Sequence, residues 1–178
     1  MREIAVEERT ELGLSPRDPF DPYQLCDQHG ISVYSLAELH EMCPEAVDHF
    51  TQVRASAWSA ALIPLGSVRL IVENHAHAIV RRRSSIAHEL GHHLLEHRFS
   101  GVILGDNHSL VFSAEQEKQA DFLAGELLIP LKAAERMAFD GWDNNRVASA
   151  YNVSTQFAQN QMKGQRVRAA RASQKFRH

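Results

Sequence analysis

The stretch that decides the fold is SSIAHELGHHLLEHR, residues 84–98, in which four positions are histidine. Within it, His88, Glu89 and His92 form the pattern His-Glu-x-x-His. On a helix, residues four apart lie about 40° apart around the axis and one turn along it. His88 and His92 therefore project side by side and can both reach one metal ion. Glu89, about 100° round from His88, is placed to act as a general base toward water.

The flanking residues predict that this stretch is helical. Ile86, Leu90 and Leu94 recur every four residues and form an apolar stripe suited to packing on a core. Ser84 or Ser85 is expected to cap the helix, because a serine hydroxyl at that position accepts a hydrogen bond from the first turn.

The same geometry keeps the other two histidines of the stretch away from the ion. His93 lies about 140° and His97 about 180° round a continuous helix from His88, so we expect both to be surface or packing residues. A longer metal-binding pattern would place glycine at 95 and histidine at 98, where this chain has Leu95 and Arg98. A third ligand must therefore come from elsewhere.

A second predicted helix, AEQEKQADFLAGELLIP at residues 114–130, offers that ligand. Glu117 and Asp121 are four apart and share a face. Two histidines and a glutamate make a catalytic zinc set with one position open, which favours Glu117 as ligand. Asp121 is expected to accept a hydrogen bond from the far ring nitrogen of a ligand histidine. Glu115 and Glu126 are rival ligands, although Glu126 lies about 180° from Glu117.

The rest of the chain predicts a small mixed fold. The expected elements are an amphipathic helix over 2–13, a short helix ending at Gly30, a strand at 31–36, a short helix before Pro44, weak alternation over 51–63 ending at Pro64, a turn near Gly66, a strand at 67–74, and a loop at 100–109. The strand at 67–74 and the segment before it predict a hairpin.

Composition excludes several classes of protein. With 44% hydrophobic and 23% charged residues, the 178-residue chain is typical of globular proteins. Cys26 and Cys43 do not make a disulfide framework. The charged N-terminus lacks the apolar region of a signal peptide, and no apolar run approaches the ~18 residues of a membrane span. We therefore expect a cytoplasmic protein.

Charge is unevenly distributed along the chain. The net charge is −3, yet residues 144–178 contain seven basic residues and no acidic one. A solvated basic tail is one interpretation, and direct DNA binding through this segment is the alternative.

Two separated motifs resemble the ImmA/IrrE family of zinc metallopeptidases. The resemblance covers residues 20–130, with RRRSSIAHELGHHLLEH at 81–97 and EKQADFLAGELLIP at 117–130. The residues that match the family pattern outside HELGH are Asn74, Arg81, Arg82, Arg83, Glu117, Ala120, Asp121, Ala124, Leu127, Leu128 and Pro130.

The resemblance implies an α+β fold with two parts. Residues 1–140 would form a minimal zincin-like core, in which a small mixed β-sheet packs on the His-Glu-x-x-His helix and the glutamate-bearing helix. Residues 141–178 would form a helical, helix-turn-helix-like annex with a basic tail.

The resemblance also implies a gluzincin-type metallopeptidase with one Zn²⁺ per chain, held by His88, His92 and Glu117, and with Glu89 as catalytic base. Family members often cleave a helix-turn-helix repressor, so such a regulatory protein is the expected substrate. Alternatives are a weakly active or non-catalytic zinc-bound anti-repressor that binds a regulator, and a DNA-binding regulator that uses the C-terminal segment.

The segment RVASAYNVSTQFAQNQMKG, residues 146–164, is similar to a helix-turn-helix-like segment of the family, although an Arg-Leu pair common there is replaced near Asn160–Met162. Residues expected to pack or cap its helices are Val147, Ala150, Tyr151, Val153 and Ser154. Candidates for base contacts are Gln156, Gln159 and Asn160. Candidates for stabilising the oxyanion of the reaction are His75, His77, His108 and Tyr151.

Overall fold

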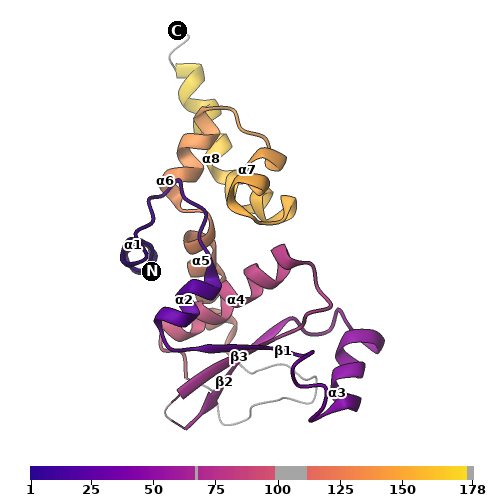
Figure 1. The fold of residues 1–178 in the computed structure, drawn as a ribbon. Coiled ribbons are helices and arrows are strands. Elements are labelled where there is room, and N and C mark those ends of the chain that lie inside the picture. Colours follow the sequence, from indigo (N-terminus) through magenta and orange to yellow (C-terminus); the bar gives the residue numbers. More distant parts are fainter. Residues whose placement is uncertain (67, 99–111, 176–178) are drawn as a thin grey trace. The chain divides into compact units, whose positions relative to one another are not determined.

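The computed structural model describes residues 1–66, 68–98 and 112–175, and it confirms the expected α+β class (Figure 1). Its strands are β1 (Ser32–Ser35), β2 (Ala60–Leu65) and β3 (Val68–Glu73). Its helices are α1 (Arg2–Glu11), α2 (Pro22–Gln28), α3 (Pro44–Asp48), the π-helical η1 (His49–Val53), α4 (Ile79–Leu94), α5 (Ala114–Leu128), α6 (Leu131–Phe139), α7 (Asn144–Tyr151) and α8 (Thr155–Lys175).

The chain forms two compact units. The first holds Met1 and residues 21–124, and the second holds residues 2–20 together with the chain from Gly125 onward. Helix α5 contributes residues to both. The domain boundary expected after residue 140 stays a prediction, because compactness alone does not define a domain.

The sheet of the first unit is built around β3. Strand β1 pairs with β3 in parallel and β2 pairs with it antiparallel, which confirms the predicted hairpin. Gly66 lies in the connection with a φ of 62°, in the left-handed region that suits glycine.

Strand β2 lies at the edge of the sheet that the described residues form, and its outer side is defined by its hydrogen bonds. The Ser59 carbonyl accepts from the Asn74 amide on the β3 side. Because peptide groups alternate along a strand, the groups of Ala60, Leu62 and Pro64 face the outer edge. Pro64, which has no amide hydrogen, is therefore tolerated there. The expectation that the segment ends at Pro64 is wrong, since β2 continues to Leu65.

Helices α2 and α4 pack on one face of the sheet, where a buried carboxylate fastens them. The Tyr23 hydroxyl of α2 donates to Glu73 Oε2 at 2.8 Å, and the Arg82 guanidinium of α4 forms an ion pair with the same Glu73. The opposite face carries an apolar cluster, which consists of Leu36, Val47 and Val72 with the half-buried Leu39, Phe50, Trp58, Ile63 and Leu70.

One expected helix is absent from the described residues. Residues 36–42, predicted as a short helix before Pro44, form consecutive turns, in which the amides of Glu38, Leu39, His40 and Met42 donate to the carbonyls three residues earlier. The Ser35 amide donates to the Glu38 carboxylate, which holds the first of these turns. Pro44 then begins the separate helix α3, where a missing amide hydrogen has no cost.

Helices α7 and α8 of the second unit form the expected helix–turn–helix. Ser154 caps α8 by accepting from the Phe157 amide at 3.0 Å, as predicted. Val147, Tyr151 and Val153 are buried, also as predicted. The prediction for Ala150 is wrong: it is exposed, and Ala148 is the alanine that α7 buries.

Helix α1 is anchored within the second unit by a buried cation. The Arg9 guanidinium is 3% exposed and donates to the carbonyls of Leu127, Ser15 and Asp18 at 2.6–2.7 Å. A buried arginine needs such acceptors to offset its lost hydration. None of the helices described here has the length and hydropathy that crossing a membrane requires.

Candidate metal centre

Helix α4 presents the His-Glu-x-x-His pattern, but it begins earlier than expected. Its first residue is Ile79, more than one turn before Ser84, so the predicted cap at Ser84 or Ser85 is wrong. Both hydroxyls instead donate to backbone carbonyls one turn earlier in the helix, which satisfies a serine in a helix interior. Ile86 and Leu90 are fully buried, as the apolar stripe predicts.

Gly91, between the two motif histidines, lets α4 and α5 approach with their backbones nearly in contact. A Cβ at Gly91 would lie 2.8 Å from the carbonyl oxygen and 2.9 Å from the Cα of Ala120. No side chain fits in that space without moving one of the helices. The Gly-Ala contact therefore sets how close the acidic residues of α5 come to the histidines of α4.

The start of α5 is fixed by a capping box. The Gln116 amide donates to the Ser113 hydroxyl, and the Ser113 amide donates to the Gln116 side-chain oxygen at 2.9 Å. Glu117 follows directly, so its position on the first turn is determined by this pair as well as by the contact at Gly91.

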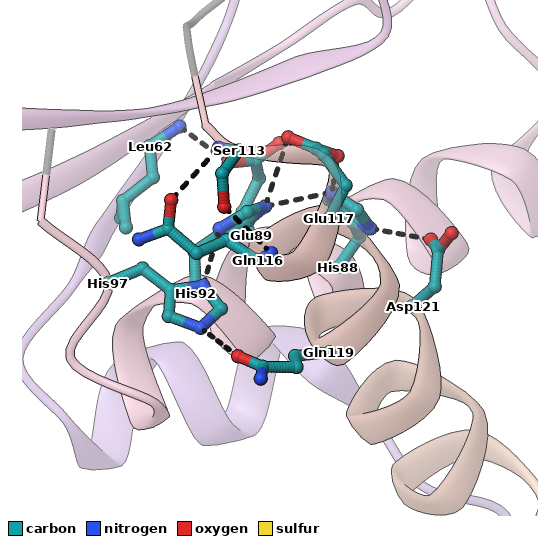
Figure 2. Close-up of polar contacts among 10 residues, drawn as sticks. All are labelled: Leu62, His88, Glu89, His92, His97, Ser113, Gln116, Glu117, Gln119 and Asp121. Carbon is teal, nitrogen blue, oxygen red and sulfur yellow. Dashed lines mark hydrogen bonds and ion pairs between the residues drawn. The ribbon is translucent and has the colours of Figure 1, made fainter. Parts of the chain in front are cut away.

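Three potential ligand side chains converge between α4 and α5 (Figure 2). His88 Nε2 lies 3.2 Å from Glu117 Oε2, His92 Nε2 lies 3.7 Å from Glu117 Oε1, and the two Nε2 atoms are 3.0 Å apart. One ligand atom from each of the three residues lies within 4.8 Å of the other two. Two imidazoles and a carboxylate form a donor set that suits zinc and leaves a fourth position open.

Asp121 lies behind His88, where the sequence placed it. Its Oδ1 is 2.8 Å from His88 Nδ1. Burial lowers the pKa of His88, but the hydrogen bond to Asp121 and the nearby carboxylates outweigh burial and leave that pKa above its ordinary value. The pKa of Asp121 is lowered by the same hydrogen bond.

Glu89 is buried beside this cluster and is held by the sheet. Its Oε2 accepts from the outward-facing Leu62 amide of β2 at 2.9 Å. Burial raises the pKa of the Glu89 carboxyl to about 7, against the opposing effects of His88 and the Leu62 amide. The surroundings thus hold a carboxyl group ready to exchange a proton near neutral pH.

The ring of His92 is held on two sides. It stacks on Phe112 with ring centroids 3.7 Å apart and an interplanar angle of 18°. Its Nδ1 lies 2.9 Å from Nδ1 of His97, whose Nε2 lies 3.0 Å from Gln119 Oε1. Burial lowers the pKa of His92 to about 3, which favours the neutral imidazole that metals bind.

His97 contacts the site because α4 ends before it. The expectation of a surface or packing histidine assumed a continuous helix, whereas α4 ends at Leu94 and Glu96 has a φ of 52°. The His97 amide donates to the His92 carbonyl and the Glu96 amide to the His93 carbonyl, which is a Schellman motif. The sequence does not predict this turn, because glutamate and not glycine occupies the left-handed position.

The remaining ligand candidates lie elsewhere among the described residues. Glu115 accepts from the Gln119 amide, and Glu126 bonds with Arg2 and the Leu131 amide in the second unit. His93 points to another partner, since its Nδ1 lies 2.9 Å from Arg69 Nη1.

None of the described oxyanion candidates is placed at the cluster by a polar contact. A ring nitrogen of His77 lies 3.0 Å from the Trp58 carbonyl, and the Tyr151 hydroxyl donates to the Pro16 carbonyl in the second unit. His75 is exposed, and His108 lies outside the described residues.

Motif residues before the histidines have structural partners in the first unit. Asn74 is fully buried, and its side chain donates to the carbonyls of Phe50, Ala55 and Trp58. Arg82 pairs with Glu73, so this part of the motif organises the sheet rather than the cluster.

The fold and site together define a class: an α+β protein with a His-Glu-x-x-His helix and a candidate centre of two histidines and one glutamate, as in metallopeptidases. The family model described as "IrrE N-terminal-like domain" (Peptidase M78) matches residues 26–163, which is most of the chain. The protein therefore belongs to this peptidase family, and the resemblance seen in the sequence is confirmed. Comparisons with curated proteins and with solved structures found no match.

Proposed function

We propose that this protein is a zinc-dependent endopeptidase of the gluzincin type, with one zinc ion per chain. The observation that carries the proposal is the convergence of His88, His92 and Glu117 beside the buried carboxyl of Glu89. Membership of a peptidase family supports it. A purely structural metal site has no need of a buried carboxyl group next to its ligands, which argues against the non-catalytic alternative.

In the proposed reaction, His88, His92 and Glu117 hold the ion and Asp121 orients His88. The ion, when bound, supplies the Lewis acidity that lets water act as a nucleophile near neutral pH. Glu89 accepts the proton of the attacking water and gives it to the leaving amine. The Leu62 amide holds one oxygen of Glu89, and we assign proton transfer to the other oxygen.

The edge of β2 is the proposed site for the substrate backbone. The peptide groups of Ala60 and Leu62 face outward there, and the Leu62 amide is bonded to Glu89. An extended peptide added to this edge forms main-chain hydrogen bonds next to the proposed base. We propose a regulatory protein, specifically a helix-turn-helix repressor, as the substrate; the family resemblance supports that class.

The test is Glu89→Gln. Glutamine keeps an oxygen that accepts from the Leu62 amide and removes the cost of burying a charge, so folding and zinc content should be retained. Hydrolysis of a quenched fluorescent peptide library by the zinc-loaded protein should fall about 10²–10⁴-fold. Glu41→Gln, at an exposed glutamate, is the control and should cleave like the wild type. Equal cleavage by the Glu89 and Glu41 variants would refute the enzyme proposal.

The substrate class has its own test. New protein N-termini are compared between cells that express the wild type and cells that express Glu89→Gln. We expect a helix-turn-helix repressor among the proteins cut only by the wild type. If the Glu89→Gln variant changes repressor-controlled transcription as strongly as the wild type, the anti-repressor alternative is correct instead.

A further inference from the structure

We propose that His97 is a positioning residue for the metal site, and that it fixes the tautomer of His92 through a hydrogen-bonded chain that runs from His92 through His97 and Gln119 to Glu115. This inference rests on the proposed function, because it assigns His92 as a metal ligand. It adds a support for the second histidine that matches the support Asp121 gives the first. All four side chains belong to the first unit and, apart from Glu115, are drawn in Figure 2.

The orientation of the His92 ring sets the direction of the chain. Its Nε2 faces the cluster, 3.0 Å from His88 Nε2, and its Nδ1 lies 2.9 Å from His97 Nδ1. A neutral imidazole that gives its Nε2 lone pair to a metal carries its proton on Nδ1. His92 Nδ1–H therefore donates and His97 Nδ1 accepts.

The far end of the chain imposes the same direction independently. The Glu115 carboxylate only accepts hydrogen bonds, so Gln119 must turn its amide nitrogen toward Glu115, from which it lies 3.4 Å. The Gln119 oxygen then faces His97 Nε2 at 3.0 Å and requires that nitrogen to donate. A neutral His97 protonated on Nε2 presents an acceptor at Nδ1. Both ends thus require the same His97 tautomer.

The fold holds His97 firmly enough for this role. The Schellman motif brings its backbone to the His92 carbonyl, and its side chain is only 7% exposed. Gln119 stands on α5 two residues after Glu117, so the chain also links the ligand of α4 to the helix that carries the third ligand. His93 adjoins His92 in sequence but bonds to Arg69, and it therefore provides a matched control.

The experiment measures zinc affinity by competition with a chromophoric chelator, for the full chain. His97→Phe keeps the ring volume and removes the acceptor, and should weaken zinc binding about 10–100-fold. His97→Asn offers an amide oxygen near the place of Nδ1 and should restore most of the affinity. His93→Phe should bind zinc like the wild type. Gln119→Leu should weaken binding by a smaller factor than His97→Phe, because His97 keeps its contact with His92.

A second readout follows the tautomer itself. Nitrogen-15 NMR of the zinc-loaded wild type should show His97 protonated on Nε2 and unprotonated on Nδ1, and the reverse tautomer of His97 would contradict the direction of the chain. Wild-type affinity in both His97→Phe and Gln119→Leu would overturn the inference and leave the zinc site standing. A wild type that binds no zinc would overturn the proposed function and this inference together. If His97→Phe fails to fold, His97→Asn and Gln119→Leu still decide. We expect Gln119→Leu to lose zinc affinity and His97→Asn to keep most of it, so a loss of affinity in both variants, or in neither, would contradict the inference.

Discussion

The charged groups around α4 and α5 differ from those of α8 in how they are held. At the candidate centre, Glu89 is buried against the Leu62 amide and His88 is bonded to Asp121. On α8, Lys163 and Arg171 are exposed on a surface helix. Buried charges are costly unless they are paired, so a protein keeps them where geometry serves a purpose. The function should therefore depend steeply on the charged groups around α4 and α5 and weakly on those of α8.

The largest difference in stability and zinc binding should come from adding one methyl group to α4 and, as a control, one to α8. Gly91→Ala puts a Cβ 2.8 Å from the Ala120 carbonyl oxygen, so α4 and α5 must separate. We expect about 1–3 kcal/mol of lost stability from overpacking and a loss of zinc binding, because Glu117 moves away from the histidines.

The control is Gly164→Ala on α8, where a Cβ meets nothing within 4 Å. Replacing glycine by alanine in an open helix interior should stabilise by about 0.5–1 kcal/mol. Denaturant unfolding should show a lower free energy of unfolding for Gly91→Ala and a higher one for Gly164→Ala, and zinc titration should show a loss of binding in Gly91→Ala. If Gly91→Ala is also stabilising and binds zinc normally, the close approach at Gly91 does not set the site.

A smaller effect is expected behind His88. Asp121→Ala removes the partner of His88 Nδ1 and should lower zinc affinity by about 10-fold. Asp140→Ala removes an exposed carboxylate that pairs with Arg136 and should leave the affinity unchanged. Competition titrations of the two variants side by side measure the difference. Equal affinities would mean that Asp121 is only a surface acid.

The smallest effects should come from the cations of α8. Lys163→Gln and Arg171→Gln should change the free energy of unfolding by less than about 0.5 kcal/mol and leave zinc affinity and peptide cleavage unchanged. Unfolding curves and the zinc titration check this. A large loss of either would show that α8 supports the site.

The DNA-binding alternative makes a separate prediction for the same two variants. If α8 contacts phosphates, the affinity for duplex DNA falls steeply with salt, and each lost contact reduces the slope of log K against log salt by about 0.9. Salt titrations with a labelled duplex measure the slope. Absent or salt-independent binding would end that alternative.

The sequence predicted the parts of the site that follow from helical periodicity. A spacing of four on a regular helix puts His88 and His92 on one face of α4 and Glu117 and Asp121 on one face of α5, and the close packing of the two helices at Gly91 brings these side chains together. The hairpin and the cap at Ser154 follow from local turn and capping chemistry in the same way.

The errors arose where the chain departs from regular geometry. His97 is buried, as a packing residue should be, but its contact with His92 does not follow from helical spacing because Glu96 adopts a left-handed conformation that is usually marked by glycine. Pro64 suggested the end of the segment because proline has no amide hydrogen for a strand pairing. Its outward position, where no such hydrogen is needed, follows from the pairing of β2 with β3, which the sequence does not give. The role of Gly91 depends on a partner helix distant in sequence, which one-helix patterns do not reveal.

The measurement that tests the central claim most directly is metal content per chain, by elemental analysis of protein purified without chelators or metal affinity resins. Wild type and Glu117→Ala are compared, since Glu117 is the ligand that α5 contributes. The account predicts close to one zinc per chain in the wild type and a clear loss in the variant. No zinc in either protein, with zinc refused on addition, would contradict it and leave HELGH as a helix that carries histidines for another reason.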